Sequence, residues 1–330
     1  MNTSDIETSD YKTFLLNRIK FSLILFLQIP ALVLSFVLFT FLKKNHQAKK
    51  APQNYALLIL LSVNFIQLSF TLPLNLNFYY HDNVTPATPA YCTGWVYLEF
   101  TLCSISEYLM ATISVQRHML VFNRYVLQIR RMRILLHHLP LYLSIIYPMT
   151  FYFFAVIMYP CDGTQWDYTS NICGPAVCYL VYDKVLGTLD WSINNGLPMV
   201  IIGLANIVLI VRVVKQKREQ QRRLSWKKQR RLTLQLFCIS SLYLVAWAPC
   251  LIVALVQILG YPTFLAQIQI DYLLFLISFI ILFLPWIYLG LLPGLFVWIK
   301  TLCRHGPPQN TIGTIAQTQL ITRTRVGIIH

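Results

Sequence analysis

Long apolar runs separated by short polar segments dominate the chain. Charge-free stretches cover residues 21–42, 55–80, 139–160, 191–211, 232–270 and 272–299. A helix rises about 1.5 Å per residue, so a hydrocarbon core about 30 Å thick needs roughly 20 apolar residues. The stretch 232–270 is too long for one span, and Gly260-Tyr261-Pro262-Thr263 supplies a turn within it. Residues 92–116, apolar except for two glutamates and uncharged polar residues, complete a prediction of seven membrane-spanning helices.

The basic residues predict the orientation of these helices. With the N-terminus outside, only Lys12, Arg18, Lys20 and Lys184 fall on the outer side, and the other 23 of the 27 lysines and arginines fall inside. Cytoplasmic loops are enriched in lysine and arginine. We therefore expect an extracellular N-terminus at 1–20, a transmembrane domain at 21–299, and a cytosolic eighth helix with a disordered tail at 300–330.

Composition supports a membrane protein and argues against nucleic-acid binding. Hydrophobic residues make up 56% of the 330 residues and charged residues 12%, whereas a soluble domain carries about 25% charged residues. The net charge of +15 could suggest a nucleic-acid partner. The basic residues of the chain, however, form short clusters that flank the apolar runs, which is typical of contact with membrane lipids.

The cysteines and sequons on the outer side predict covalent modifications. Four of eight cysteines lie there, Cys92, Cys161, Cys173 and Cys178. They predict two disulfides, with three pairings open. Two Asn-x-Ser/Thr sequons, at Asn2 and Asn83, also fall outside and are candidate glycosylation sites.

Two spans carry recognisable motifs. The third begins at Cys92, has Trp95 three residues later, and ends in Val115-Gln116-Arg117-His118. The sixth contains Tyr243-Leu244-Val245-Ala246-Trp247-Ala248-Pro249. On these motifs, residues 20–305 resemble a rhodopsin-like (class A) G-protein-coupled receptor. The resemblance implies an all-α seven-helix bundle, with Gln116 standing where the family has an acid and Ala246 where it usually has a cysteine.

The resemblance also assigns roles to individual residues. It implies that Cys92 bonds Cys178, which leaves Cys161 for Cys173. The implied activation switch comprises Gln116, Arg117, Tyr243, Trp247, Pro249, Pro293 and Phe296. Cys303, just past the last span, is a palmitoylation candidate. Asn64 replaces the family's usual sodium-binding Asp, so sodium regulation is not expected.

The third span also carries two intramembrane acids, which mark interior or cavity-facing positions. Glu99 resembles the position where aminergic receptors keep an Asp for the ligand ammonium, and the ligand pocket is placed at Glu99 and Trp247. Glu107 lies deeper in the third span, and two interpretations stay open: a role in signalling, or a structural polar contact. The long, aromatic-rich segment 161–190 suits peptide capture, so a peptide is favoured over a small amine.

The expected function is that of a plasma-membrane receptor that binds an extracellular ligand and activates a heterotrimeric G protein by outward movement of the sixth helix. A transporter or channel is the alternative, but the sequence shows no internal repeat. Enzyme motifs such as His-Glu-x-x-His and Gly-x-Ser-x-Gly are absent from the sequence. No cofactor or metal is expected, and the seventh span lacks the lysine that retinal requires. Because Gln116 cannot form an ion pair with Arg117, we expect ligand-independent activity.

Overall fold

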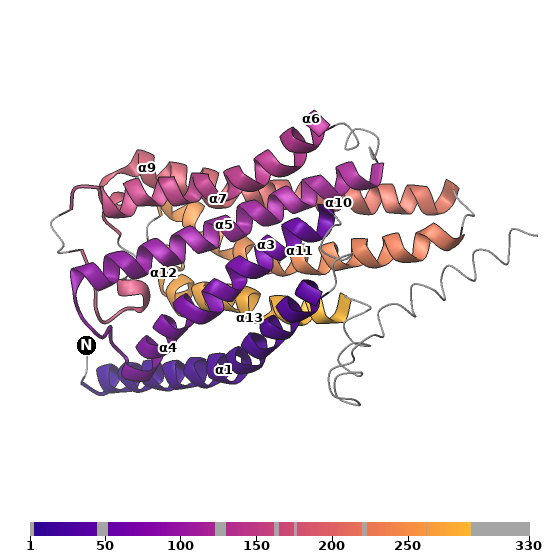
Figure 1. Cartoon of the computed structure of the whole chain (residues 1–330). Coiled ribbons are helices and arrows are strands. Elements are labelled where there is room, and N and C mark those ends of the chain that lie inside the picture. The colour runs from indigo at the N-terminus through magenta and orange to yellow at the C-terminus, as the bar shows by residue number, and fades with distance from the viewer. Residues whose placement is uncertain are drawn as a thin grey trace, which may run out of the picture. The chain divides into compact units, whose positions relative to one another are not determined.

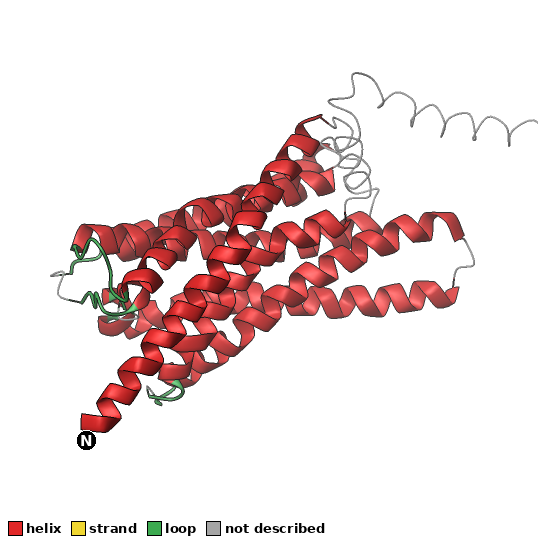
Figure 2. Ribbon diagram, turned by 90° about the horizontal axis from the view of Figure 1, so that it is seen from below, coloured by secondary structure: helices red, strands yellow, loops and turns green. Residues whose placement is uncertain are grey.

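The computed structural model describes residues 3–44, 52–122, 130–161, 165–174, 177–219, 223–261 and 263–291. Helices joined by short loops make up these residues, and no strand occurs among them (Figure 2). All of them belong to one compact unit that ends at Leu291. Residues 292–330 lie outside the described part of the chain.

Seven helical rods cross this unit, and four of them contain at least one π-helical turn. Their segments in chain order are as follows: α1 (Thr3–Lys44); α3 (Pro52–Ile66), η1 (Gln67–Thr71) and α4 (Leu72–His81); α5 (Pro89–Phe122); α6 (Arg130–Arg133), η3 (Ile134–His138), α7 (Leu139–Tyr152) and η4 (Phe153–Ile157); α9 (Lys184–Leu189), η6 (Asp190–Gly196) and α10 (Leu197–Glu219); α11 (Arg223–Ile258); α12 (Ala266–Ile268), η7 (Gln269–Leu273) and α13 (Leu274–Leu291). Two short elements, η5 (Asn171–Cys173) and α8 (Cys178–Tyr182), lie between the fourth and fifth rods.

The predicted spans are confirmed. Six rods are long and apolar enough to cross a membrane. The remaining rod, α5, is 34 residues long but carries the two glutamates. The predicted turn separates α11 from α12. In the first rod, α1 begins at Thr3, so most of the segment expected to precede the membrane is helical.

The third rod, α5, occupies the centre of the bundle. It packs against α3, α7, α10 and α11 (Figure 1). The first rod contacts α4 and α13, while α11 packs between α10 and α13. A side chain on α5 can therefore reach four other rods, which is why the polar residues of α5 are the starting point for the functional site.

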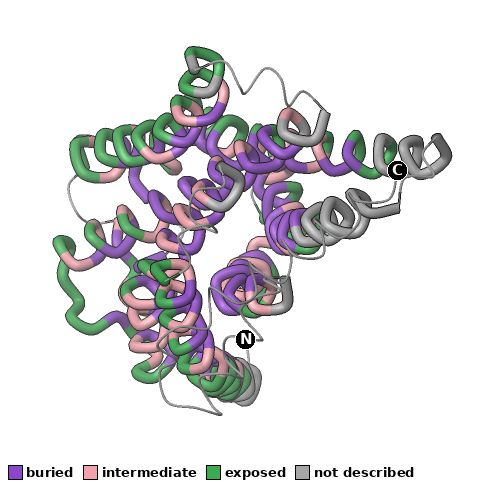
Figure 3. Tube along the Cα trace, turned by 45° about the vertical axis from the view of Figure 1, so that its right-hand side comes forward, coloured by how far each residue is buried: buried purple, intermediate pink, exposed green. Residues whose placement is uncertain are grey.

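The bundle is apolar on its outside as well as inside. In Figure 3 the buried residues lie on the inward sides of the rods and the exposed residues on the outward sides. Outward residues include Phe26, Phe154 and Val245, which are 77%, 65% and 66% exposed. Such extensive exposed apolar surface fits a lipid environment and not water.

The two ends of the bundle differ in their chemistry. The end near the N-terminus carries both disulfides and the described loops, drawn green in Figure 2; we call it the disulfide end. The opposite end carries Lys43, Lys44 and Arg117, and we call it the basic end. The basic segment that follows the fifth span is helical, since α10 continues to Glu219 and α11 resumes at Arg223.

Candidate functional site

Four cysteines close a cap over the disulfide end, but their pairing differs from expectation. Cys92 at the start of α5 bonds Cys173, and Cys161 bonds Cys178. The expected pairs Cys92–Cys178 and Cys161–Cys173 are therefore wrong. The two disulfides themselves are confirmed.

The first reason for this pairing is a compact turn that carries Cys173 back over α5. The backbone N–H of Asp167 donates to the Cys173 carbonyl at 3.0 Å, and the N–H of Val84 donates to the Tyr168 carbonyl at 2.7 Å. Hydrogen bonds from Ser170 and Thr169 hold the Asp167 carboxylate and lower its pKa from the ordinary value.

Gly174 ends this turn at a φ of +88°, where a Cβ would lie 3.0 Å from the Cβ of Asp167. A side chain at this position would be both strained and crowded. The turn therefore depends on a glycine between the two disulfide cysteines Cys173 and Cys178.

The second reason is a polar cluster that holds the residue after Cys178 against the fourth and fifth rods. The hydroxyls of Tyr179 and Tyr152 each donate to the Asp190 carboxylate at 2.8 Å, and Asn194 Nδ2 donates to it at 2.7 Å. Asp190 is only 3% exposed. We call these four residues the Asp190 cluster. It keeps Cys178 beside the end of the fourth rod, where Cys161 lies.

Beneath the cap, Glu99 forms a polar recess with residues of the second rod. Thr71, Asn75, Trp95 and Cys103 surround its carboxylate. The Cys103 thiol donates a long, weak hydrogen bond to Oε1 at 3.9 Å. Within the described residues, Glu99 Oε2, Trp95 Nε1 and Asn75 Oδ1 are buried without a hydrogen-bond partner. Buried polar atoms in folded proteins are nearly always paired, so this recess has unused capacity to bind a polar ligand.

Trp247 and Glu107 lie deeper, on α11 and α5. Trp247 is 8% exposed and Glu107 fully buried. Both carboxylate oxygens of Glu107 lack a hydrogen-bond partner among the described residues. The Tyr243 side chain lies within electrostatic range of Glu107 and of Tyr288 on α13, so the third, sixth and seventh rods meet at this level.

At the basic end, Gln116 contacts the fourth rod. Its Nε2 donates to the His137 carbonyl at 2.9 Å, and His137 Nδ1 donates to its Oε1 at 2.9 Å. Arg117, the next residue, is 6% exposed and interacts electrostatically with Tyr288. The hydroxyl of Tyr288 donates to the Leu57 carbonyl on α3 at 3.1 Å.

Three polar residues that join neighbouring rods were missed by sequence reasoning. His137 and Tyr288 have no motif of their own, and only their packing against Gln116 and Arg117 reveals them. Asn206 on α10 accepts a hydrogen bond from Ser240 on α11 at 2.9 Å, which joins the fifth and sixth rods. The signal available in sequence was a polar residue within an apolar run, and many other residues share it.

Other predicted residues are placed or fall outside the description. Asn83 is exposed in the loop between α4 and α5, and the Asn64 amide donates to the Ile281 carbonyl at 2.9 Å. Pro249 lies inside α11. Asn2, Pro293, Phe296 and Cys303 lie outside the described residues.

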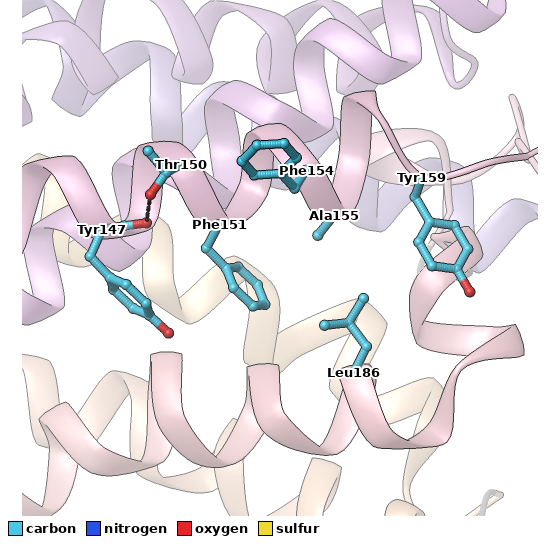
Figure 4. Close-up of a pocket in the computed structure, with 7 residues that line it drawn as sticks. All are labelled: Tyr147, Thr150, Phe151, Phe154, Ala155, Tyr159 and Leu186. Carbon is cyan, nitrogen blue, oxygen red and sulfur yellow. Dashed lines mark hydrogen bonds between the residues drawn. The ribbon is translucent and has the colours of Figure 1, made fainter.

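A separate apolar hollow lies between the fourth and fifth rods (Figure 4). Its volume is about 410 Å³. Phe151 and Ala155 point across it toward Leu186 of α9. Neither Glu99 nor Trp247 lines it. Apolar walls on an outward surface suit lipid acyl chains more than a charged ligand.

Comparison with known proteins identifies the family. A model of the 7 transmembrane receptor (rhodopsin family) matches residues 35–288. A search of curated proteins finds no match. The family match covers most of the chain, from the end of α1 into α13, so the chain belongs to the rhodopsin family of seven-transmembrane receptors. It is a multi-pass membrane protein of the receptor type, a class that signals through G proteins and not by enzymatic catalysis.

Proposed function

We propose that this chain is a plasma-membrane receptor for an extracellular ligand that carries an ammonium group, a peptide in preference to a small amine. Ligand binding activates a heterotrimeric G protein through outward movement of the basic end of α11. The observation that carries this proposal is the Glu99 recess, in which one carboxylate oxygen is buried without a hydrogen-bond partner among the described residues.

The chemistry of the recess favours an ammonium ligand. Removing a carboxylate from water is unfavourable by several kcal/mol unless an opposite charge or good hydrogen bonds compensate for it. The long thiol contact from Cys103 and the neighbouring polar side chains of Thr71, Asn75 and Trp95 supply no positive charge to offset it. An ammonium group has three donors and a positive charge, so it can pair with Glu99 and also donate to Asn75 Oδ1, which is buried beside the carboxylate.

The cap above the recess favours a peptide. Two disulfides and the Asp190 cluster fix the loop at both of its ends. Exposed aromatic side chains on the cap include Tyr182, at 71% exposed. Aromatic side chains offer large contact area for a peptide backbone and side chains.

The route to the basic end runs along α11. Pro249 removes a backbone hydrogen bond in the middle of this helix and so allows a bend there. Trp247 and Tyr243 lie on the basic side of Pro249 and are buried against the bundle core. A ligand that binds better to the state with α11 moved outward shifts the population toward that state. The Ser240–Asn206 bond between α11 and α10 is one contact that this movement breaks.

The test uses cells that report several G-protein pathways, exposed to amines and to short peptides with free or acetylated N-termini. Free ammonium groups should activate, and acetylation should abolish the response. A charge-assisted bond contributes about 1.5–3 kcal/mol, so Glu99→Gln should raise the half-maximal concentration roughly 10- to 150-fold. Glu99→Asp, which keeps the charge, serves as the control. Equal potency of acetylated and free peptides would refute the proposal.

A further inference from the structure

Lys20 is a second buried charge at the disulfide end. It lies on α1 and is only 4% exposed. Its Nζ is 5.4 Å from the ring centroid of Tyr79 on α4 and 5.6 Å from that of Phe275 on α13. The ammonium is thus held between the first, second and seventh rods by two aromatic rings.

Cation–π contact compensates only part of the hydration that Lys20 loses on burial. Such contacts are worth about 0.5–2 kcal/mol, whereas burying an ion is unfavourable by several kcal/mol. Its neighbour on α1, Arg18, pairs with Asp82 at 3.1 Å, but no such ion pair joins Lys20 to a described carboxylate. Lys20 therefore has no carboxylate of the described chain in direct contact.

Asp271 is a candidate for a structural partner of Lys20. It attracts the ammonium electrostatically but forms no ion pair with it within 4 Å. One of its oxygens, Oδ2, accepts a hydrogen bond from Gln267 Nε2 at 2.8 Å. Asp271 is also partly exposed, so solvent weakens its attraction for Lys20.

Tyr79 joins Lys20 to the Glu99 recess. Its buried ring lies under the Lys20 ammonium and within electrostatic range of Glu99. Its hydroxyl accepts a hydrogen bond from Asn171 Nδ2 of the cap at 3.1 Å. A cation and an anion, each short of a partner, therefore flank the same tyrosine beneath the same loop.

We propose that Lys20 binds a carboxylate of the ligand, so that the ligand is zwitterionic, with its ammonium at Glu99 and its carboxylate at Lys20. This inference rests on the proposed function and specifies its ligand class. A zwitterion supplies both missing counter-charges and adds no net charge to the bundle. The lysine ammonium is a compact point charge with three donors, and a carboxylate matches its single charge. Free amino acids and short peptides with free termini both carry this chemistry.

The test measures ligand binding by thermal unfolding of the purified full-length receptor in lipid nanodiscs. The probes are amino acids and short peptides with both termini free, the same compounds amidated at the carboxylate, and the same compounds acetylated at the amine. We expect tight binding only with both termini free. Amidation should weaken binding by about tenfold or more. Free amino acids and peptides are separate arms, so the better-binding arm identifies the source of the carboxylate.

Receptor variants then locate the carboxylate. Lys20→Gln should weaken binding of the free compounds about tenfold or more and leave the amidated compounds unaffected. Lys20→Arg should retain binding. Arg18→Gln removes a charge from the same helix and is the matched control, expected to bind normally. Asp271→Asn should strengthen binding of free compounds, because it removes a negative charge near the ligand carboxylate; a purely structural Lys20–Asp271 pair predicts weakening instead.

The outcomes separate this inference from the proposed function. If amidated and free compounds bind equally and Glu99→Gln weakens both, the carboxylate site is wrong and the ammonium site stands. If acetylated compounds bind as tightly as free ones and only Lys20→Gln weakens them, the ammonium site is wrong and the carboxylate site stands. If no compound raises the unfolding temperature, the ligand class is refuted. Should Lys20→Gln fail to fold, the comparison of amidated and free compounds on the unaltered receptor decides.

Discussion

Gln116 uses both halves of its amide at the basic end of α5. Its nitrogen donates to the His137 carbonyl and its oxygen accepts from His137 Nδ1, each at 2.9 Å. A glutamate in the same place could still accept from Nδ1, but its second oxygen would face the carbonyl and repel it. The family's acid therefore suits this contact poorly, and the glutamine replaces a restraint on Arg117 with a bond to the fourth rod.

The first prediction follows from this contact: Gln116→Glu should lower ligand-independent signalling. The carboxylate, repelled by the His137 carbonyl, is free to pair with Arg117 and favour the inactive state. A charge-assisted bond exceeds a neutral one by about 1 kcal/mol, which changes the active-to-inactive ratio roughly fivefold. Basal second-messenger output, normalised to surface protein, measures the change in ligand-independent signalling. Gln116→Met also loses the His137 bonds but adds no charge; an equal fall in this control would show that the ion pair is not the cause.

Residues that belong to a motif could be predicted from the sequence, and those defined only by packing could not. Arg117 was placed at the basic end because 25 residues of helix from Cys92 span about 37 Å. Gln116 was identified as a replaced acid, but its partner His137 was not, since a histidine at the start of an apolar run has many explanations. Tyr288 became visible only through its closeness to Arg117 and its bond to Leu57.

At the scale of elements, hydrophobic length predicts the rods but not how the loops connect. About 20 apolar residues suffice to predict a span, so all seven were found. The disulfide pairing depends instead on which rod anchors each half of the loop. The Tyr168 carbonyl accepts a hydrogen bond from the N–H of Val84 beside α5, and the Tyr179 hydroxyl donates one to Asp190 of the fifth rod. These anchors lie outside the Cys-Gly-Pro-Ala-Val-Cys cluster, and the spacing of the cysteines does not reveal them.

The second prediction concerns the Asp190 cluster. Tyr152→Phe and Tyr179→Phe each remove one hydroxyl from a buried carboxylate and should each lower the free energy of unfolding by about 1.5–3 kcal/mol. Thermal unfolding of the purified receptor measures the loss. Tyr182→Phe alters an exposed tyrosine of the same segment and should leave stability unchanged. Equal losses in all three variants would mean that the cluster does not stabilise the cap.

Across the whole molecule, α5 connects the two ends of the receptor. It carries Cys92, Glu99 and Glu107 in turn before Arg117 at the basic end. The sixth rod runs beside it and carries Pro249, Trp247 and Tyr243 from the disulfide side toward the basic side. Because α5 packs against four rods while α11 has Pro249 inside it, we expect α5 to stay in place and α11 to move.

The last prediction tests this division of roles at Arg117. Arg117 is buried at the basic end and interacts with Tyr288 of the seventh rod. Under the proposed mechanism, outward movement of α11 should free the Arg117 side chain to contact the G protein and stabilise the complex. Arg117→Ala should therefore abolish G-protein activation, both basal and induced by the zwitterionic compounds, while ligand binding and surface expression persist. Tyr288→Phe removes the hydroxyl that bonds Leu57 and lies near Arg117, so it should loosen the inactive arrangement and raise basal output. Nucleotide exchange on purified G proteins, measured with equal amounts of each receptor variant in nanodiscs, separates loss of coupling from loss of protein. A full exchange rate with Arg117→Ala would show that the receptor engages its G protein through other residues.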